Sequence, residues 1–247
     1  MLDGVSTSAY WRPSTIEQAL ELLDHPGAVV LAGGTWRNGQ PILDTLEVVE
    51  VVDLQALDLG RIEPGMEDSL RIGAMTTLQH LVESGDVPAV VREAARREEP
   101  STLRAQATIG GCIASGHAES ELLGALLVHE AVVDVVAGGG TESIPLEALL
   151  ADLPLDAGRV VTSVTILTAG VAAAAHTART PADRAIVAAF ARATGDGRRI
   201  ALTGVAPTPI LVQPGEELDP IGDFRGSSDY RRALAEVLLA RVVEAIS

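Results

Sequence analysis

Two short segments combine paired glycines with a threonine, a combination suited to binding an anion. They are AGGT at residues 32–35 and TIGG at residues 108–111. Glycine tolerates a positive φ and lets the backbone approach a ligand closely. Successive N–H groups in such a turn form a concave anion-binding nest, to which a threonine hydroxyl adds a donor. Two nests facing each other would hold a diphosphate, although two ordinary tight turns would leave the same pattern.

Several other chemistries are excluded by what the chain lacks. Neither glycine segment matches the G-x-G-x-x-G fingerprint or the P-loop. All 18 basic residues are arginine, which excludes a Schiff-base lysine. Cys112 is the only cysteine, so the chain alone holds no disulfide and no iron–sulfur cluster. His25, His80 and His129 show no metal-ligand spacing.

Composition indicates a soluble globular protein, with 47% hydrophobic and 21% charged residues. A net charge of −16 predicts repulsion of nucleic acid and of anionic membranes. Aromatic residues make up only 2% of the chain, which disfavours a platform for stacking bases. No apolar run reaches the roughly 18 residues of a membrane span, and no signal peptide is visible. We therefore expect a cytoplasmic protein without membrane insertion.

The first glycine segment lies within a predicted β-α-β unit over about residues 8–56. Strands are expected at residues 28–32 and 48–54 because both runs are apolar. Before the first of these strands, STIEQALELL predicts a helix, with Ser14 and Glu17 as its capping box.

The second glycine segment is expected at the end of another strand, within ATIGGCIA. Further along, GRVVTSVTIL alternates and predicts a strand. The residue composition changes near residue 171. Beyond that point, a GDG turn at residues 195–197 predicts an antiparallel hairpin. A closing helix is predicted from the cap Ser228 onward.

Seven segments in order carry a family resemblance. They are YWRPSTIEQALELL, AGGT, LRIGAMTTLQHL, LRAQATIGGCIA, PLEALL, IALTGVAPTPI and SSDYRRALAEVLLARV. In this order the chain resembles the FAD-binding (medium) subunit of the molybdenum hydroxylases, the flavoprotein family of carbon monoxide dehydrogenase and xanthine dehydrogenase. The resemblance implies an α+β fold with FAD-binding subdomains at residues 1–56 and 57–170. A C-terminal domain of antiparallel sheet plus helices would occupy residues 171–247.

The resemblance also implies where FAD contacts the chain, because the family's first glycine turn lies against the cofactor's diphosphate. Glu121 stands where the family has an aspartate that contacts the sugar-alcohol hydroxyls, and His176 falls roughly where it has a lysine. Cys112 replaces a common asparagine, and Ala105 departs from the usual Arg-Asn pair. The cofactor-binding residues expected from the resemblance are Ala32, Gly33, Gly34, Thr35, Trp36, Ala107, Thr108, Gly110, Gly111, Cys112, Ala114, Ser115, Glu121, Val161 and His176.

The function implied is electron transfer within an oxidoreductase complex. FAD would take electrons from iron–sulfur clusters on a small subunit and pass them to an external acceptor, while a molybdopterin large subunit oxidises the substrate. An alternative is a structural or regulatory subunit that has lost FAD, and a third is a free-standing flavin oxidase. Valine at Gly33 or Gly111 is expected to abolish FAD binding while leaving the fold largely intact.

Overall fold

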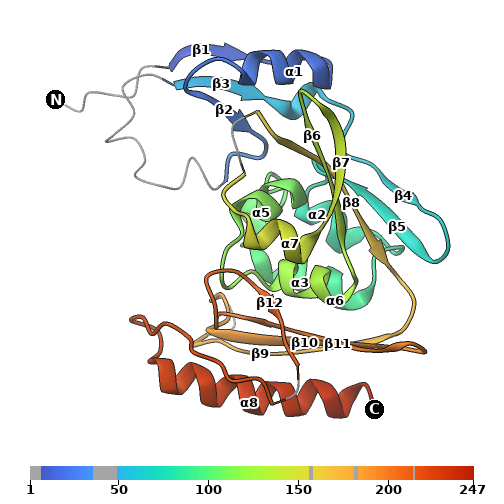
Figure 1. Ribbon diagram of the computed structural model, residues 1–247, viewed down its shortest axis with the longest axis vertical. Coiled ribbons are helices and arrows are strands. Elements are labelled where there is room, and N and C mark those ends of the chain that lie inside the picture. Colours follow the sequence, from blue (N-terminus) through green and yellow to red (C-terminus); the bar gives the residue numbers. More distant parts are fainter. Residues whose placement is uncertain (1–6, 36–48, 156–157, 181–182, 214) are drawn as a thin grey trace.

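The computed structural model describes residues 7–35, 49–155, 158–180, 183–213 and 215–247. Figure 1 shows three sheets arranged along the long axis, with helices between the second and third and α8 beyond the third. The α+β fold class predicted from the sequence is confirmed. The division into domains stays a prediction, although each sheet draws its strands from one continuous stretch of chain.

The first sheet is the β-α-β unit expected from the sequence. Its elements are β1 (Thr7–Trp11), α1 (Ile16–Leu23), β2 (Ala28–Leu31) and β3 (Val49–Asp53). The strand order is β1-β3-β2, and both pairings are parallel. Strand β2 therefore lies at an edge, where the first glycine segment leaves the sheet.

The cap of α1 lies one residue later than predicted. Thr15 has an extended backbone, and its hydroxyl accepts the N–H of Gln18 at 3.3 Å. Gln18, rather than Glu17, reaches back, since its Oε1 accepts the N–H of Ser14 at 3.1 Å. Thr15 with Gln18 has the same three-residue spacing as Ser14 with Glu17, so the sequence pattern alone could not choose between them.

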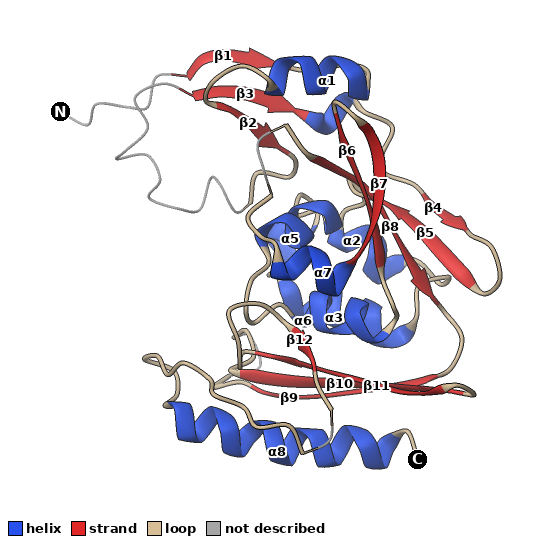
Figure 2. Ribbon diagram, viewed as in Figure 1, coloured by secondary structure: helices blue, strands red, loops and turns tan. Residues whose placement is uncertain are grey.

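The second sheet has five antiparallel strands in the order β4-β5-β8-β6-β7. Helices cover it and form the largest buried apolar cluster with it (Figure 2). The strands are β4 (Ile62–Pro64), β5 (Ser69–Gly73), β6 (Val132–Ala137), β7 (Gly140–Pro145) and β8 (Val160–Leu167). The helices are α2 (Leu78–Glu83), α3 (Ala89–Glu98), α4 (Ser101–Arg104), α5 (Ile109–Ser115), α6 (Glu121–Val128) and α7 (Leu146–Ala151).

The second glycine segment begins a helix, so the strand predicted before it is wrong. Thr108 is extended for a single bridge to Thr77 and then caps α5, accepting the N–H of Gly111 at 3.1 Å. Gly110 and Gly111 thus occupy the first turn of a helix. Glycine is a poor helix former, which is why the sequence suggested a turn.

The third sheet lies between α6 and the closing helix α8 (Ser228–Ala245), which Ser227 caps instead of the predicted Ser228. Its order is β12-β11-β10-β9, all antiparallel, and it includes the predicted hairpin. The strands are β9 (Val171–Thr177), β10 (Val187–Thr194), β11 (Gly197–Thr203) and β12 (Ile210–Leu211).

Strand β10 is buried on both faces. Ala188 and Phe190 join the apolar cluster around α6, whereas Val187, Ala189 and Ala191 join the cluster under α8. This assignment follows from the two-residue period of a strand. One strand therefore joins the core of the second sheet to the core of the C-terminal layer.

Gly124 lets α6 approach this strand closely, which gives a stability prediction. A Cβ at Gly124 would lie 2.6 Å from Phe190 Cδ2 and 2.8 Å from Thr203 Cγ2. We expect Gly124→Val to lower the free energy of unfolding by about 1–3 kcal/mol, the usual cost of overpacking a core. Urea denaturation monitored by circular dichroism measures it. Gly85→Val is the matched control, because a Cβ at Gly85 meets nothing within 4 Å; equal losses in both variants would contradict the prediction.

Candidate functional site

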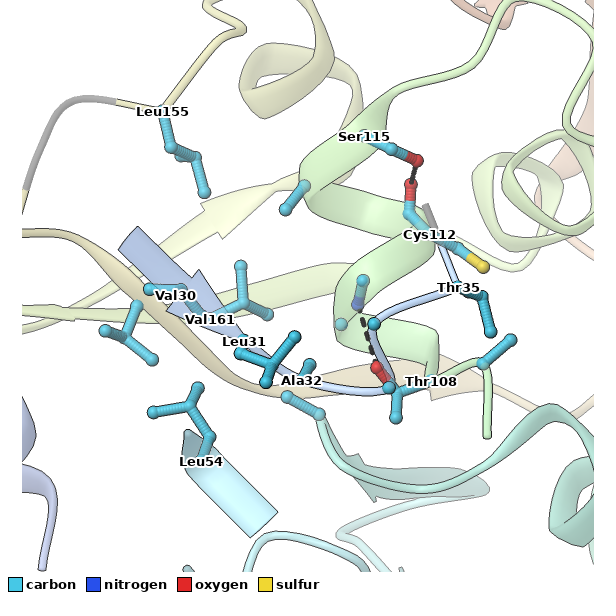
Figure 3. Close-up of a pocket in the computed structure, with 18 of the residues that line it drawn as sticks. Val30, Leu31, Ala32, Thr35, Leu54, Thr108, Cys112, Ser115, Leu155 and Val161 are labelled. Carbon is cyan, nitrogen blue, oxygen red and sulfur yellow. Dashed lines mark hydrogen bonds between the residues drawn. The ribbon is translucent and has the colours of Figure 1, made fainter. Parts of the chain in front are cut away.

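A cleft of about 420 Å³ lies where the end of β2 meets α5. Figure 3 shows aliphatic side chains on one side, among them Val30, Leu54 and Val161, with the first turn of α5 across from them. Pro154, Leu155, residues 158–161 and Arg184, from the segment before β10, also line it. The volume lies within the usual range of a small-molecule site.

The backbone of the first glycine segment touches the backbone just before the second segment. A Cβ at Gly33 would stand 1.9 Å from the carbonyl oxygen of Gln106 and 3.2 Å from Cα of Ala107. Gly33 is therefore required by the chain's own backbone, independently of any ligand. The expectation that Gly33→Val leaves the fold largely intact is corrected, since valine here would force the two segments apart.

The two glycines of the second segment are needed for different structural reasons. A Cβ at Gly110 would lie 2.7 Å from Cβ of Ala74, so Gly110 lets α5 pack against the end of β5. A Cβ at Gly111 would meet only the Thr108 hydroxyl, at 3.1 Å. Gly111 lines the cleft, and a side chain there would occupy cleft space.

Backbone donors are available from the first segment and occupied in the second. The N–H of Ile109 donates to Thr76 O, and that of Gly110 to Ala74 O. The N–H groups of Gly111 and Cys112 bond to Thr108. The expectation of two facing nests is therefore corrected: the second segment offers no free N–H in its first turn.

The first segment keeps the character of a nest. Within the described part of the chain, the N–H groups of Gly33, Gly34 and Thr35 have no hydrogen-bond partner. Gly34 has φ of 71°, the left-handed region that a nest needs. Thr108 has accepted a bond from Gly111, but its hydroxyl proton remains able to donate. Anion binding in the cleft would thus depend mainly on residues 33–35.

The end of the cleft nearest the third sheet carries charge. Glu98 and Glu99 come from the end of α3, and Arg184 comes from the segment before β10. Arg184 Nη2 lies 2.7 Å from Glu99 Oε1. Glu98 is only 4% exposed, and its Oε2 accepts the N–H of Leu122 at 3.1 Å in the first turn of α6.

The pKa values at this end follow from burial. Loss of water raises the pKa of Glu98, and burial, reinforced by the nearby Glu98, raises the pKa of the Cys112 thiol well above its usual value. The thiol is therefore protonated at neutral pH, and the reactive thiolate is disfavoured. Burial and the Arg184 charge both lower the pKa of His117, which favours the neutral imidazole.

Most residues expected from the resemblance line this cleft. They are Ala32, Gly33, Gly34, Thr35, Ala107, Thr108, Gly110, Gly111, Cys112, Ala114, Ser115 and Val161. Trp36 lies outside the described residues. Sequence reasoning missed Glu98, Glu99 and Arg184. No local motif marks these three residues. Glu98 and Glu99 stand at the end of α3, where the sequence shows only the pattern of an amphipathic helix.

Glu121 and His176 do not line the cleft; the structure brings them to each other instead. Glu121 is 4% exposed and lies 3.2 Å from Arg97 Nε and 3.8 Å from His176 Nδ1. Burial raises the pKa of Glu121 to about 7, partly offset by Arg97. Although Glu121 stands in the first turn of α6, it is buried, and its contacts join α3, α6 and β9.

In the described ranges, no helix is both long and apolar enough to cross a membrane. Over the same residues, no group of three or more His, Cys, Asp and Glu side chains is placed to hold a metal ion.

Comparisons with known proteins agree on one family. Residues 5–166 match the model described as "FAD binding domain in molybdopterin dehydrogenase". The chain is 35% identical over 250 residues to protein YgfM of Escherichia coli (strain K12), covering 94% of this chain and 93% of the relative. It is 28% identical over 278 residues to the nicotine 6-hydroxylase medium subunit of Paenarthrobacter nicotinovorans, covering 95% of each. A carbon monoxide dehydrogenase chain from Hydrogenophaga pseudoflava has the same fold, with a TM-score of 0.87, 23% identity and 98% coverage of each chain.

The raised pKa of Glu121 predicts a pH dependence of stability. A carboxyl with a higher pKa folded than unfolded binds more protons in the folded state, so its contribution falls as pH rises from 4.5 to about 7. Relative to the wild type, Glu121→Gln should gain up to roughly 3 kcal/mol across this interval. Urea denaturation of both proteins at several pH values measures it. The exposed Glu147→Gln is the control, and a pH-independent difference for Glu121→Gln would refute the prediction.

Proposed function

Since this chain belongs to the family of FAD-binding domains in molybdopterin dehydrogenases, we propose that it is the FAD-binding electron-transfer subunit of a molybdenum hydroxylase-type complex. The family match confirms the resemblance found in the sequence and FAD as the cofactor. Electrons would enter from iron–sulfur clusters on a partner and leave through FAD to an external acceptor.

The observation that carries the proposal is the cleft between β2 and α5. It offers three backbone N–H groups without partners in the described chain, and Gly111 supplies room that a side chain would fill. Aliphatic side chains line the wall opposite. Together these features fit a cofactor with a diphosphate between two flat ring systems.

Each part of the chain has a distinct role in this proposal. The N–H groups of Gly33, Gly34 and Thr35 bind the diphosphate, and the Thr108 hydroxyl adds a donor. Leu23, Val30, Leu54 and other aliphatic side chains exclude water from the bound rings. When bound, FAD supplies the chemistry of accepting and releasing electrons, while the protein supplies position and electrostatics. Sites for acid–base catalysis on a substrate are not required here.

The partners follow from the relatives and from the chain's own composition. The nicotine 6-hydroxylase relative is a medium subunit by name, which implies further subunits in that enzyme. With Cys112 as its one cysteine, this chain cannot itself hold an iron–sulfur cluster. We propose an iron–sulfur small subunit and a molybdopterin large subunit as partners in a cytoplasmic hetero-oligomer, active as an oxidoreductase only when assembled.

The competing proposal is a structural or regulatory subunit of such a complex that has lost FAD. It draws on the replacements at Cys112 and Ala105 and on the placement of Glu121 and His176 outside the cleft. A free-standing flavin oxidase has less support, because the nicotine 6-hydroxylase relative is by name a medium subunit of a larger enzyme. FAD retention separates the first two proposals.

The test substitutes the glycine that only the cleft requires. We expect Gly111→Val to weaken FAD binding at least tenfold, because its side chain would fill cofactor space, whereas the Thr108 hydroxyl, at 3.1 Å, is the one described side chain that its Cβ would meet. The measurement is the flavin absorbance that remains with purified protein after FAD is added and excess removed, with circular dichroism to verify folding. Gly85→Val is the matched control and should bind FAD like the wild type.

The outcomes separate the proposals clearly. A folded Gly111→Val protein that retains FAD like the wild type would show that the diphosphate does not lie against α5. A folded wild-type protein that retains no FAD would instead favour the FAD-deficient subunit. Gly33→Val is unsuitable for this test, because its clash with Gln106 would confound loss of binding with loss of structure.

A further inference from the structure

We propose that Arg184, held by Glu99, contacts the redox-active ring of FAD and raises its reduction potential. The inference rests on the proposed function, because it concerns FAD in the cleft. The sequence had assigned a possible cationic role near the flavin to His176. The structure places His176 against Glu121, outside the cleft, and brings Arg184 to the cleft instead.

Arg184 has hydrogen-bonding capacity left for a ligand. Its guanidinium makes one ion pair, from Nη2 to Glu99 Oε1 at 2.7 Å. Among the described residues, its Nε and Nη1 have no hydrogen-bond partner. The side chain is 32% exposed and lines the cleft. A planar fork of donors suits a ring edge that carries carbonyl and nitrogen acceptors.

The charge of Arg184 already acts on the groups around it. It is the largest charge effect on Glu98, whose pKa it lowers against the effect of burial. It also lowers the pKa of His117 and of the Cys112 thiol. Three groups lining the same end of the cleft therefore experience its positive field. A ligand that gains negative charge there would be stabilised by the same field.

The opposite end of the cleft is unsuited to this role. Leu23, Val30 and Leu54 line it with aliphatic groups. The other arginine in the lining, Arg159, lies 3.4 Å from Glu142 and 4.0 Å from Asp152. Arg159 thus has two carboxylates as ion-pair partners, whereas Arg184 has one ion-pair partner, Glu99, and acts at longer range on Glu98, whose pKa burial raises. Within the described lining, Arg184 is the arginine at the charged end of the cleft, and it has a single ion-pair partner.

Reduction makes the flavin more negative, which is the change that a neighbouring cation favours. The ring takes up two electrons and one proton, so it gains one negative charge; in the test a chemical reductant such as dithionite supplies the electrons and water the proton. A neighbouring cation binds the reduced form more tightly than the oxidised form, which raises the potential. Glu99 opposes this effect by screening Arg184. Removing the positive charge of Arg184 should therefore lower the reduction potential, and removing the negative charge of Glu99 should raise it.

The experiment measures the midpoint potential of FAD bound to the full-length chain by spectroelectrochemical titration. Arg184→Met should lower the potential, weakening the binding of reduced relative to oxidised FAD about tenfold, or ~30 mV for a two-electron couple. Glu99→Gln should raise it. Arg184→Lys should restore most of the wild-type potential because the charge is kept. Arg179→Met is the control, since Arg179 pairs with Asp183 outside the cleft.

The result that overturns the inference is a wild-type potential in folded Arg184→Met protein that still binds FAD. A loss of affinity for oxidised FAD with an unchanged potential would also overturn it, because Arg184 would then contact the phosphates. If Arg184→Met does not fold, the direction of the Glu99→Gln shift decides. In each of these cases the proposed function stands. A wild-type chain that retains no FAD would contradict both the proposed function and the inference about Arg184.

Discussion

The cleft depends on one backbone contact, the approach of Gly33 to Gln106 and Ala107. This contact joins the edge of the first sheet to the loop that enters α5, and it tolerates no Cβ. Because it fixes the two segments against each other, the N–H groups of residues 33–35 are held beside the first turn of α5. Gly110 extends the same constraint by letting α5 pack on Ala74. The walls of the site are thus set before any ligand binds, which reduces the ordering cost of binding.

A second close approach connects this site to the C-terminal layer. Gly124 lets α6 pack against Phe190, and the first turn of α6 bonds to Glu98 in the cleft. The neighbouring Glu121 is held by Arg97 and His176. Helix α6 therefore contacts the charged end of the cleft and the third sheet at once. This arrangement explains how a residue as late in the chain as Arg184 comes to line a site built mainly from residues before 162.

The cleft is suited to binding an anion, although the chain as a whole is strongly negative. The protein has a net charge of −16, yet the cleft combines Arg184, paired with Glu99, with three N–H groups that have no partner among the described residues. An anionic cofactor would therefore be attracted locally while the surface repels other polyanions. Cys112, the residue with the most obvious redox chemistry, takes no part, because burial favours its protonated thiol.

The sequence by itself predicted the fold class and, through the family resemblance, FAD as the cofactor. It could do so because strand period, glycine pairs and segment order are local properties. The structure places twelve of the fifteen residues expected to bind FAD in the lining of one cleft, while their contact with FAD stays a prediction. Only the tertiary structure decided that Gly33 serves a backbone contact, that Gly110 and Gly111 begin a helix, and that Glu121 and His176 pair away from the cleft. It alone brought Glu98, Glu99 and Arg184 together. Such contacts join residues up to 85 positions apart, so they depend on how the layers pack rather than on any local pattern.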